Sequence, residues 1–199
     1  MEQMTDGYRI VKRLVDLGVS ASLIAALAPA LGAIALAVKL DSPGPALFRQ
    51  KRLGKGGTIF EILKFRTMRK DASVVIGDDH TVVNTAGDDR VTRVGRLLRQ
   101  TSLDELPQLI NVLVGDMSLV GPRPDLPTGL GVYNEEQRRK LEVQPGITGL
   151  AQVSGRNLLT AEEKWGLDVE YVDRNGIVMD ASIIAKTAFG VLTRKGIYK

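Results

Sequence analysis

The hydrophobic pattern of the chain is dominated by one uncharged stretch near its N-terminus. Residues 17–38, LGVSASLIAALAPALGAIALAV, contain no charged side chain over 22 positions. As a helix they would extend about 33 Å, enough to cross the hydrocarbon core of a bilayer. The run is too long for a signal peptide, and no cleavage site follows it. Because uncharged runs of this length are rare in soluble folds, the pattern favours a membrane-inserted helix over a buried core helix.

Pro29 lies near the middle of this stretch and predicts a break in the helix. A proline removes a backbone hydrogen bond and costs about 3 kcal/mol in a helix interior. Both ends of the stretch are flanked by basic residues, namely Arg9, Lys12, Arg13, Lys39, Arg49, Lys51 and Arg52. The positive-inside rule places such flanks on the cytoplasmic side. We therefore predict a re-entrant helix–break–helix over residues 1–40; the alternative is a proline-kinked helix that spans the membrane.

Beyond residue 40 the pattern changes to short elements that are typical of one compact unit. Two strands are predicted, at 46–53 and 58–66, with a hairpin turn at the Gly-Lys-Gly between them. Five helices are predicted, at 91–99, 106–114, 134–143, 162–174 and 177–192. Residues 70–90 are acidic and polar and predict a loop. The fold class is therefore α+β, a mostly helical compact domain of residues 41–199 with a short β-hairpin.

Charge and composition narrow the chemistry that such a domain can perform. The net charge is +4 and the isoelectric point about 9.4, which suits phosphate-rich substrates, anionic lipid or nucleic acid without choosing among them. The chain has no cysteine, which excludes disulfides, thiolate metal sites and a cysteine nucleophile. Its one histidine, His80, lies in the polar loop. Any bound metal is therefore expected to be hard and held by oxygen, as magnesium is.

Two adjacent carboxylates, Asp104 and Glu105, precede the helix predicted at 106–114. One explanation is structural, because Ser102 and Glu105 have the spacing of a capping box at a helix start. The other is catalytic. Neighbouring side chains of a regular helix point about 100° apart, so the pair could act on one target only where a helix begins or is distorted. The proline two residues after Glu105 allows this, and Arg99 and Arg123 on either side would attract phosphate.

The helix predicted at 91–99 carries Arg93, Arg96 and Arg99 at spacings of three, beside apolar residues. This basic face could lie against an anionic membrane surface. A solvated helix face explains the same letters equally well. The pattern leaves open a second function, that of a non-catalytic, membrane-anchored module that binds anionic lipid.

A series of motifs in fixed order then identifies a resemblance. These motifs are KRLVDL at 12–17, KFRTM at 64–68, SLDELPQLINVL at 102–113, GDMSLVGPRP at 115–124, PGITGLAQVSGRN at 145–157 and LDVEYV at 167–172. Over roughly residues 12–192 the chain resembles the small monotopic phosphoglycosyl transferases, the bacterial sugar transferase family. The family's helix break is Ser-Pro, whereas this chain has Ala28-Pro29, so the sharpness of the break is less secured here.

The resemblance implies transfer of a phospho-sugar from a UDP-sugar to a membrane polyprenol phosphate of the undecaprenyl type, with release of UMP. It implies that Asp104 is the nucleophile, forms a covalent aspartyl phospho-sugar and binds magnesium, and that Glu105 assists proton removal from the acceptor. The implied place is the cytoplasmic face of a bacterial inner membrane, as the first membrane step of glycoconjugate assembly, with no nucleic acid partner. Direct, non-covalent catalysis by the same carboxylates is the alternative mechanism. The sugar and the oligomeric state do not follow from the resemblance.

Motif matching also assigns contacts to the substrate. The expected substrate-binding residues are Lys64, Arg99, Pro122, Arg123, Arg156, Asn157 and Asp168. Asp168 matches an acidic position of the family, and we expect it to have a structural or supporting role.

Overall fold

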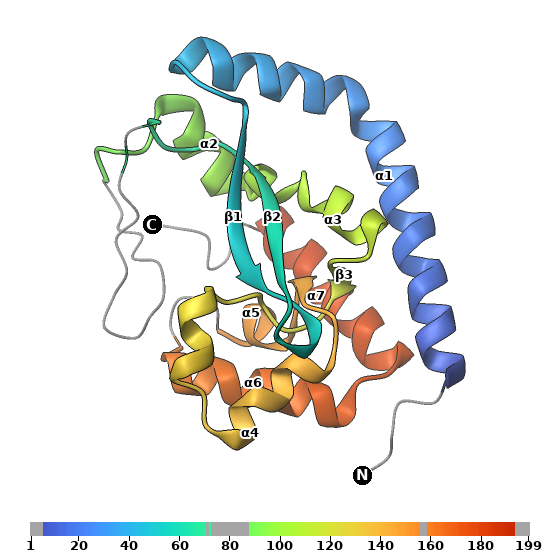
Figure 1. Cartoon of the computed structure of the whole chain (residues 1–199). Coiled ribbons are helices and arrows are strands. Elements are labelled where there is room, and N and C mark those ends of the chain that lie inside the picture. The colour runs from blue at the N-terminus through green and yellow to red at the C-terminus, as the bar shows by residue number, and fades with distance from the viewer. Residues whose placement is uncertain (1–5, 71, 73–87, 156–158, 194–199) are drawn as a thin grey trace.

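The computed structural model describes residues 6–70, 72, 88–155 and 159–193. These residues form an α+β body that is mostly helical, with one long helix arched along its outside (Figure 1). The predicted fold class is confirmed at this level. His80, Arg156 and Asn157 lie outside the described residues.

Helix α1 (Asp6–Asp41) contains the apolar stretch and begins well before it. The helix is continuous through Pro29, and Figure 1 shows that it changes direction partway along. Within the described part of the chain, it is the one helix long and apolar enough to cross a membrane. Its buried residues are Tyr8, Asp16, Ser20 and Val38, so its first half and its C-terminal end contact the body, whereas no residue of 21–30 is buried. The re-entrant topology stays a prediction.

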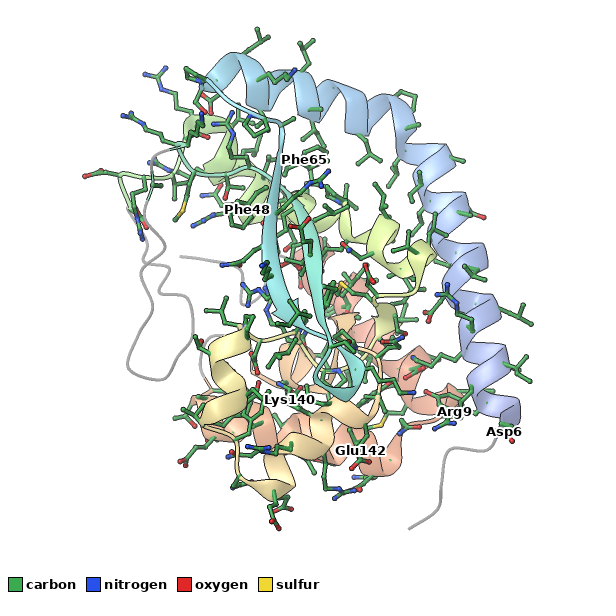
Figure 2. All side chains as sticks on the ribbon, in the orientation of Figure 1. Asp6, Arg9, Phe48, Phe65, Lys140 and Glu142 are labelled. Atoms are coloured by element: carbon green, nitrogen blue, oxygen red, sulfur yellow. The ribbon has the colours of Figure 1, made fainter. Side chains whose placement is uncertain are left out.

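The predicted hairpin is present as strands β1 (Leu47–Leu53) and β2 (Ile59–Phe65), joined by the 3₁₀ turn η1 (Lys55–Gly57). The strands pair antiparallel, with Leu47 opposite Phe65. Phe65 packs with Val38 of α1 and with Leu98 of α2, and Figure 2 shows Phe65 at the end of the hairpin that lies near α1. A bare strand edge exposes unpaired backbone groups. Asn111 satisfies this need on β2, because its side chain accepts from Leu63 N at 2.9 Å and donates to Glu61 O at 2.8 Å.

Two helices frame the carboxylate pair. Helix α2 (Arg93–Thr101) precedes the 3₁₀ turn η2 (Leu103–Glu105), and helix α3 (Gln108–Val114) follows it. The capping-box interpretation of Ser102 is wrong. Ser102 has φ 57°, ends α2 in the left-handed region and makes no side-chain cap, whereas a helix N-cap needs extended backbone. Pro107 is the N-cap of α3, so this helix begins two residues later than predicted.

The rest of the body is built around a short parallel pair of strands, β3 (Ser118–Val120) and β4 (Gly146–Thr148), which the sequence did not predict. The backbones approach so closely that a Cβ on Gly146 would lie 2.1 Å from Gly121 N. Around this pair lie η3 (Pro127–Gly131), α4 (Glu135–Arg138), η4 (Arg139–Glu142), α5 (Leu150–Ser154), α6 (Ala161–Arg174) and α7 (Ile177–Thr193). The principal core cluster joins β3 to α6 and α7 through Val120, Val143, Tyr171 and Ile183.

Candidate active site

Glu105 is held by two cations. Its Oε1 accepts hydrogen bonds from Lys64 Nζ at 2.6 Å and from Arg123 Nη2 at 3.0 Å. The Glu105 and Lys64 side chains are 21% and 17% exposed, and that of Arg123 is 49% exposed. Burial would raise the pKa of Glu105, but Lys64 and Arg123 outweigh it and hold that pKa below its usual range. Glu105 is therefore ionised at neutral pH and is a weak base.

Asp104 differs from its neighbour, although both belong to η2. Within the described part of the chain its carboxylate has no hydrogen-bond partner, and the residue is partly exposed. Burial and the charge of Glu105 raise the pKa of Asp104 to about 6, while Lys64, Arg123 and Arg99 act in the opposite direction. The irregular turn thus presents one free carboxylate beside one engaged carboxylate. Environments that push two carboxyl pKa values apart are typical of paired catalytic groups.

Three separate elements bring the cations to this turn. Lys64 comes from β2, and burial, opposed by Glu105, lowers its pKa. Arg99 comes from the last turn of α2, where its Nε donates to Thr67 Oγ1 at 2.9 Å. Arg123 comes from the Pro-Arg-Pro loop after β3. Three of the seven predicted substrate contacts therefore lie close enough to influence the carboxylate pair.

The other predicted contacts lie apart from the carboxylate pair or outside the described residues. Pro122 is fully buried in the loop that carries Arg123. Asp168 is 2% exposed, and its Oδ2 lies 2.6 Å from Lys140 Nζ, so it reaches the site only through other residues. Arg156 and Asn157 fall outside the described residues, and their assignment stays a prediction.

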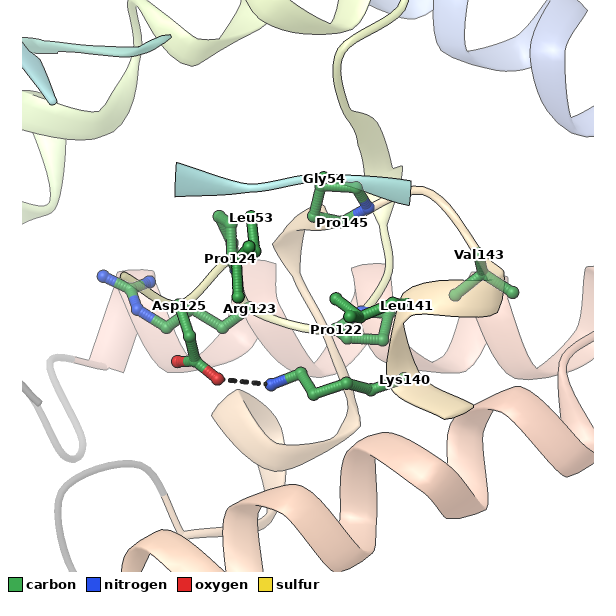
Figure 3. A pocket seen from close by; sticks show the side chains of 10 residues that line it. All are labelled: Leu53, Gly54, Pro122, Arg123, Pro124, Asp125, Lys140, Leu141, Val143 and Pro145. Carbon is green, nitrogen blue, oxygen red and sulfur yellow. Dashed lines mark hydrogen bonds and ion pairs between the residues drawn. The ribbon is translucent and has the colours of Figure 1, made fainter. Parts of the chain in front are cut away.

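Behind Arg123 lies a buried polar cluster that the sequence did not reveal. Asp125 Oδ2 accepts hydrogen bonds from Tyr133 Oη at 2.5 Å, Lys140 Nζ at 2.7 Å and Trp165 Nε1 at 3.2 Å. Figure 3 shows the Arg123 side chain extending away from the Asp125–Lys140 ion pair. Asp125, two residues after Arg123, is thereby anchored by three donors. The cluster fixes the loop that presents Arg123.

Two further residues near the Arg123 loop, Lys140 and Arg52, were not predicted to belong to the site. Lys140 belongs to the helix predicted at 134–143, yet it is only 4% exposed and lies between Asp125 and Asp168. The single predicted helix was wrong, because the segment is divided into α4 and η4 and Lys140 turns inward. Arg52, on β1, donates to Pro124 O at 3.2 Å, and burial and the charge of Arg123 lower its pKa to about 10. The only sequence signal for an inward-facing Arg52 was its position in the alternating pattern of the predicted strand.

The donor set for a metal is small. Among the described residues, no group of three or more His, Cys, Asp or Glu side chains gathers to bind an ion. The free carboxylate of Asp104 still suits magnesium, which usually keeps waters and takes one or two carboxylates together with substrate phosphates. The raised pKa of Asp104 means that a nearby cation would be favourable.

Comparison with known proteins gives a consistent answer. The chain is 45% identical to a UDP-glucose:undecaprenyl-phosphate glucose-1-phosphate transferase of Caulobacter vibrioides, over 94% of this chain and 72% of that protein. It is 44% identical to the exopolysaccharide production protein PSS of Rhizobium leguminosarum, over 93% and 96% of the two chains. It is 41% identical to the Escherichia coli protein with the same name as that of Caulobacter, over 96% of this chain and 42% of that one.

A family model matches the chain as well, in agreement with the motifs and the relatives. The family model described as bacterial sugar transferase covers residues 7–194. The chain therefore belongs to the bacterial sugar transferase family.

Proposed function

We propose that this protein transfers a phospho-sugar from a UDP-sugar to a polyprenol phosphate of the undecaprenyl type and releases UMP. The observation that carries the proposal is the free carboxylate of Asp104 beside Glu105, with Lys64 and Arg123 both bound to Glu105. The Caulobacter and Escherichia relatives are named as UDP-glucose:undecaprenyl-phosphate glucose-1-phosphate transferases, so UDP-glucose is the first donor to test.

In the proposed first step, an oxygen of ionised Asp104 attacks the β-phosphorus of the UDP-sugar. A bond forms between that oxygen and phosphorus, the bridging phosphorus–oxygen bond to UMP breaks, and UMP leaves with the electron pair. In the second step, a phosphate oxygen of the polyprenol phosphate attacks the same phosphorus and releases Asp104. Covalent capture of this kind divides one difficult displacement into two easier ones.

The neighbouring groups supply charge compensation. Lys64 and Arg123 offer positive charge where the diphosphate and the leaving UMP carry negative charge. Glu105 orients both cations. The predicted role of Glu105 in removing a proton from the acceptor stays a prediction. Its lowered pKa argues against that role, and an acceptor phosphate with a second pKa of about 6 is already mostly ionised at neutral pH. Magnesium bound at Asp104 would neutralise phosphate charge and align the diphosphate.

We further propose that the site faces the cytoplasmic leaflet of a bacterial inner membrane. Large apolar side chains are exposed on the elements next to the carboxylate pair, among them Leu97 on α2, Leu103 on η2 and Ile110 on α3. Exposed apolar surface of this kind favours contact with lipid. The polyprenol phosphate could therefore present its phosphate group to Asp104 while its hydrocarbon chain stays in the bilayer.

The proposal is tested by incubating the detergent-solubilised or reconstituted chain with UDP-glucose and magnesium, then with undecaprenyl phosphate. UMP release and an acid-quenched adduct of hexose-phosphate mass on the peptide containing Asp104 are expected. Asp104→Asn should lose both, whereas the exposed Asp173→Asn should keep both. UMP release without any adduct would favour direct displacement. No UMP release with a broad panel of UDP-sugars, together with retained binding to anionic vesicles, would favour the lipid-binding module.

A further inference from the structure

The first half of α1 is bonded to the far end of α3. Arg13 donates through Nη1 to Val112 O at 2.7 Å and through Nη2 to Leu113 O at 3.0 Å. These carbonyls belong to the last turn of α3, where no following helical turn supplies donors; Val112 O also accepts from Gly115 N at 3.2 Å. A cation at this end also complements the helix dipole. Arg13 therefore fixes the C-terminal end of α3, and α3 begins three residues after Glu105.

The C-terminal end of α1 is bonded to the N-terminal end of α2, which is the end remote from the carboxylate pair. Asp41, the last residue of α1, accepts through Oδ2 from Val94 N at 2.9 Å. Val94 lies in the first turn of α2, where an N–H group lacks a partner within the helix and a carboxylate is favourable. The buried Arg66 secures this end of α1 in turn, by donating to Ser42 O at 2.8 Å and to Val38 O at 3.3 Å.

The carboxylate pair lies between these two fixed ends. Chain order runs from Val94 through α2 to the turn with Asp104 and Glu105, and then through α3 to Leu113. One long helix thus holds the outer end of each of the two helices that carry the turn between them. The basic residues that precede the apolar stretch also make contacts within the protein. Arg13 binds α3, and Lys12 Nζ lies 2.6 Å from Asp180 Oδ2.

We propose that Arg13 and Asp41 are positioning residues, through which α1 sets the spacing of α2 and α3 and so aligns Asp104 with its cations. Neither residue is expected to touch substrate. Misalignment by about 1 Å can cost on the order of 100-fold in rate while binding is largely kept. The catalytic consequence rests on the proposed function; the geometric claim does not.

The kinetic test compares four variants of the full chain in bilayers with UDP-glucose and undecaprenyl phosphate. Arg13→Gln and Asp41→Ala should lower kcat by about 10- to 100-fold and leave KM for the donor within about twofold. Asp41→Asn keeps an acceptor oxygen and should recover most of kcat. Arg9→Gln removes a charge from the exposed side of the same helix and should leave kcat unchanged. Wild-type kcat in both Arg13→Gln and Asp41→Ala, or a loss that Asp41→Asn does not reverse, would overturn the proposal.

A second measurement needs no activity. The chain has no cysteine, so a double variant with one cysteine at the exposed Gln100 of α2 and one at the exposed Val114 of α3 can carry a pair of spin labels. The distance between the two labels reports the spacing of α2 and α3. The wild type and Asp41→Asn should give the same narrow distance distribution, and Arg13→Gln and Asp41→Ala should shift or broaden it. An unchanged distribution in both variants would overturn the geometric claim, whatever the kinetics. A wild type that releases no UMP would contradict the proposed function, and this measurement would still decide the spacing.

Discussion

Lys64 Nζ lies 2.6 Å from Glu105 Oε1, in an ion pair formed between a strand of the hairpin and the turn that carries both carboxylates. Arg123 approaches the same oxygen from the Pro-Arg-Pro loop. The two adjacent carboxylates, Asp104 and Glu105, therefore have different environments. Glu105 is bound to cations and has a lowered pKa, whereas Asp104 has no hydrogen-bond partner among the described residues and has a raised pKa.

Replacing Lys64 with methionine should disable the site without unfolding the chain. The change removes one of the two cations on Glu105 and one of the three that lower the pKa of Asp104. We expect kcat/KM for UMP release to fall by about 100-fold, the usual scale for loss of one charge-stabilising donor. Lys51→Met, on the exposed face of β1, is the matched control and should stay near wild type. A Lys64→Met enzyme within threefold of wild type would remove Lys64 from the proposed machinery.

The sequence predicted much of this arrangement, and the residues it missed have a common reason. The apolar run, the hairpin and most helices follow from local periodicity, and the fold class follows from them. The β3–β4 pair and the inward turn of Lys140 depend on contacts between distant segments, which periodicity does not encode. Ser102 has the letters of a cap, yet tertiary packing places it in the left-handed region at the end of α2. Local pattern reports which face is apolar, not which partner a buried charge meets.

Lys140 should be among the least replaceable residues of the body. It is 3% exposed at the side chain and lies between two carboxylates, Asp125 at 2.7 Å and Asp168 at 2.6 Å. Lys140→Met would leave the buried carboxylate of Asp168 and the partly exposed carboxylate of Asp125 without their shared cation, and breaking a buried pair costs about 3–5 kcal/mol. Denaturant unfolding in detergent should register this loss. Arg174→Met, which breaks an exposed pair with Glu170, should cost less than about 1 kcal/mol, and equal losses in the two variants would contradict the assignment.

The ionisation of Asp168 should make stability depend on pH. Burial, opposed by Lys140, raises its pKa to about 6 in the folded protein, against about 3.9 in an unfolded chain. A raised folded pKa contributes stability that is full below about pH 4 and is lost as the pH rises through about 6. The free energy of unfolding of the wild type, minus that of Asp168→Asn, should therefore fall by on the order of 1–3 kcal/mol from about pH 5 to about pH 8.

The subtraction in this experiment isolates Asp168, because other titrating groups such as Asp104 are present in both proteins. A difference that stays constant with pH would mean that Asp168 remains ionised throughout. A difference that grows with pH would reverse the assigned direction.

Gly95 should resist even the smallest enlargement. It lies where α2 crosses the segment after β2, and an added Cβ would lie 2.1 Å from Thr67 O. Thr67 also receives Arg99, so a displaced α2 would disturb a cation beside Asp104. Overpacking of this kind costs about 1–3 kcal/mol, and we expect Gly95→Ala to lower the unfolding midpoint and the rate of UMP release together. Gly166→Ala, in open space on α6, should instead stabilise by about 0.5–1 kcal/mol.

The two ends of α1 should be found on the same side of the membrane. Tyr8 donates to Asp180 Oδ2 at 2.9 Å near one end, and Val38 packs on Phe65 and Leu98 near the other. If the helix crossed a hydrocarbon core of about 30 Å, one body could not contact both ends from a single side. Single cysteines replacing Arg9 and Thr193 in this cysteine-free chain should react with an impermeant maleimide only from the cytoplasmic side.

A cysteine replacing Ala26, in the exposed apolar middle of α1, serves as the control for insertion. It should stay unlabelled from either side until detergent is added. Labelling of position 9 from the periplasmic side, with position 193 still cytoplasmic, would make α1 a spanning helix. In that case the contacts of Tyr8 with Asp180 and of Arg13 with α3 could not form in the membrane, and the alignment of the carboxylate pair by α1 would be lost with them. The topology and the positioning of Asp104 therefore depend on the same contacts.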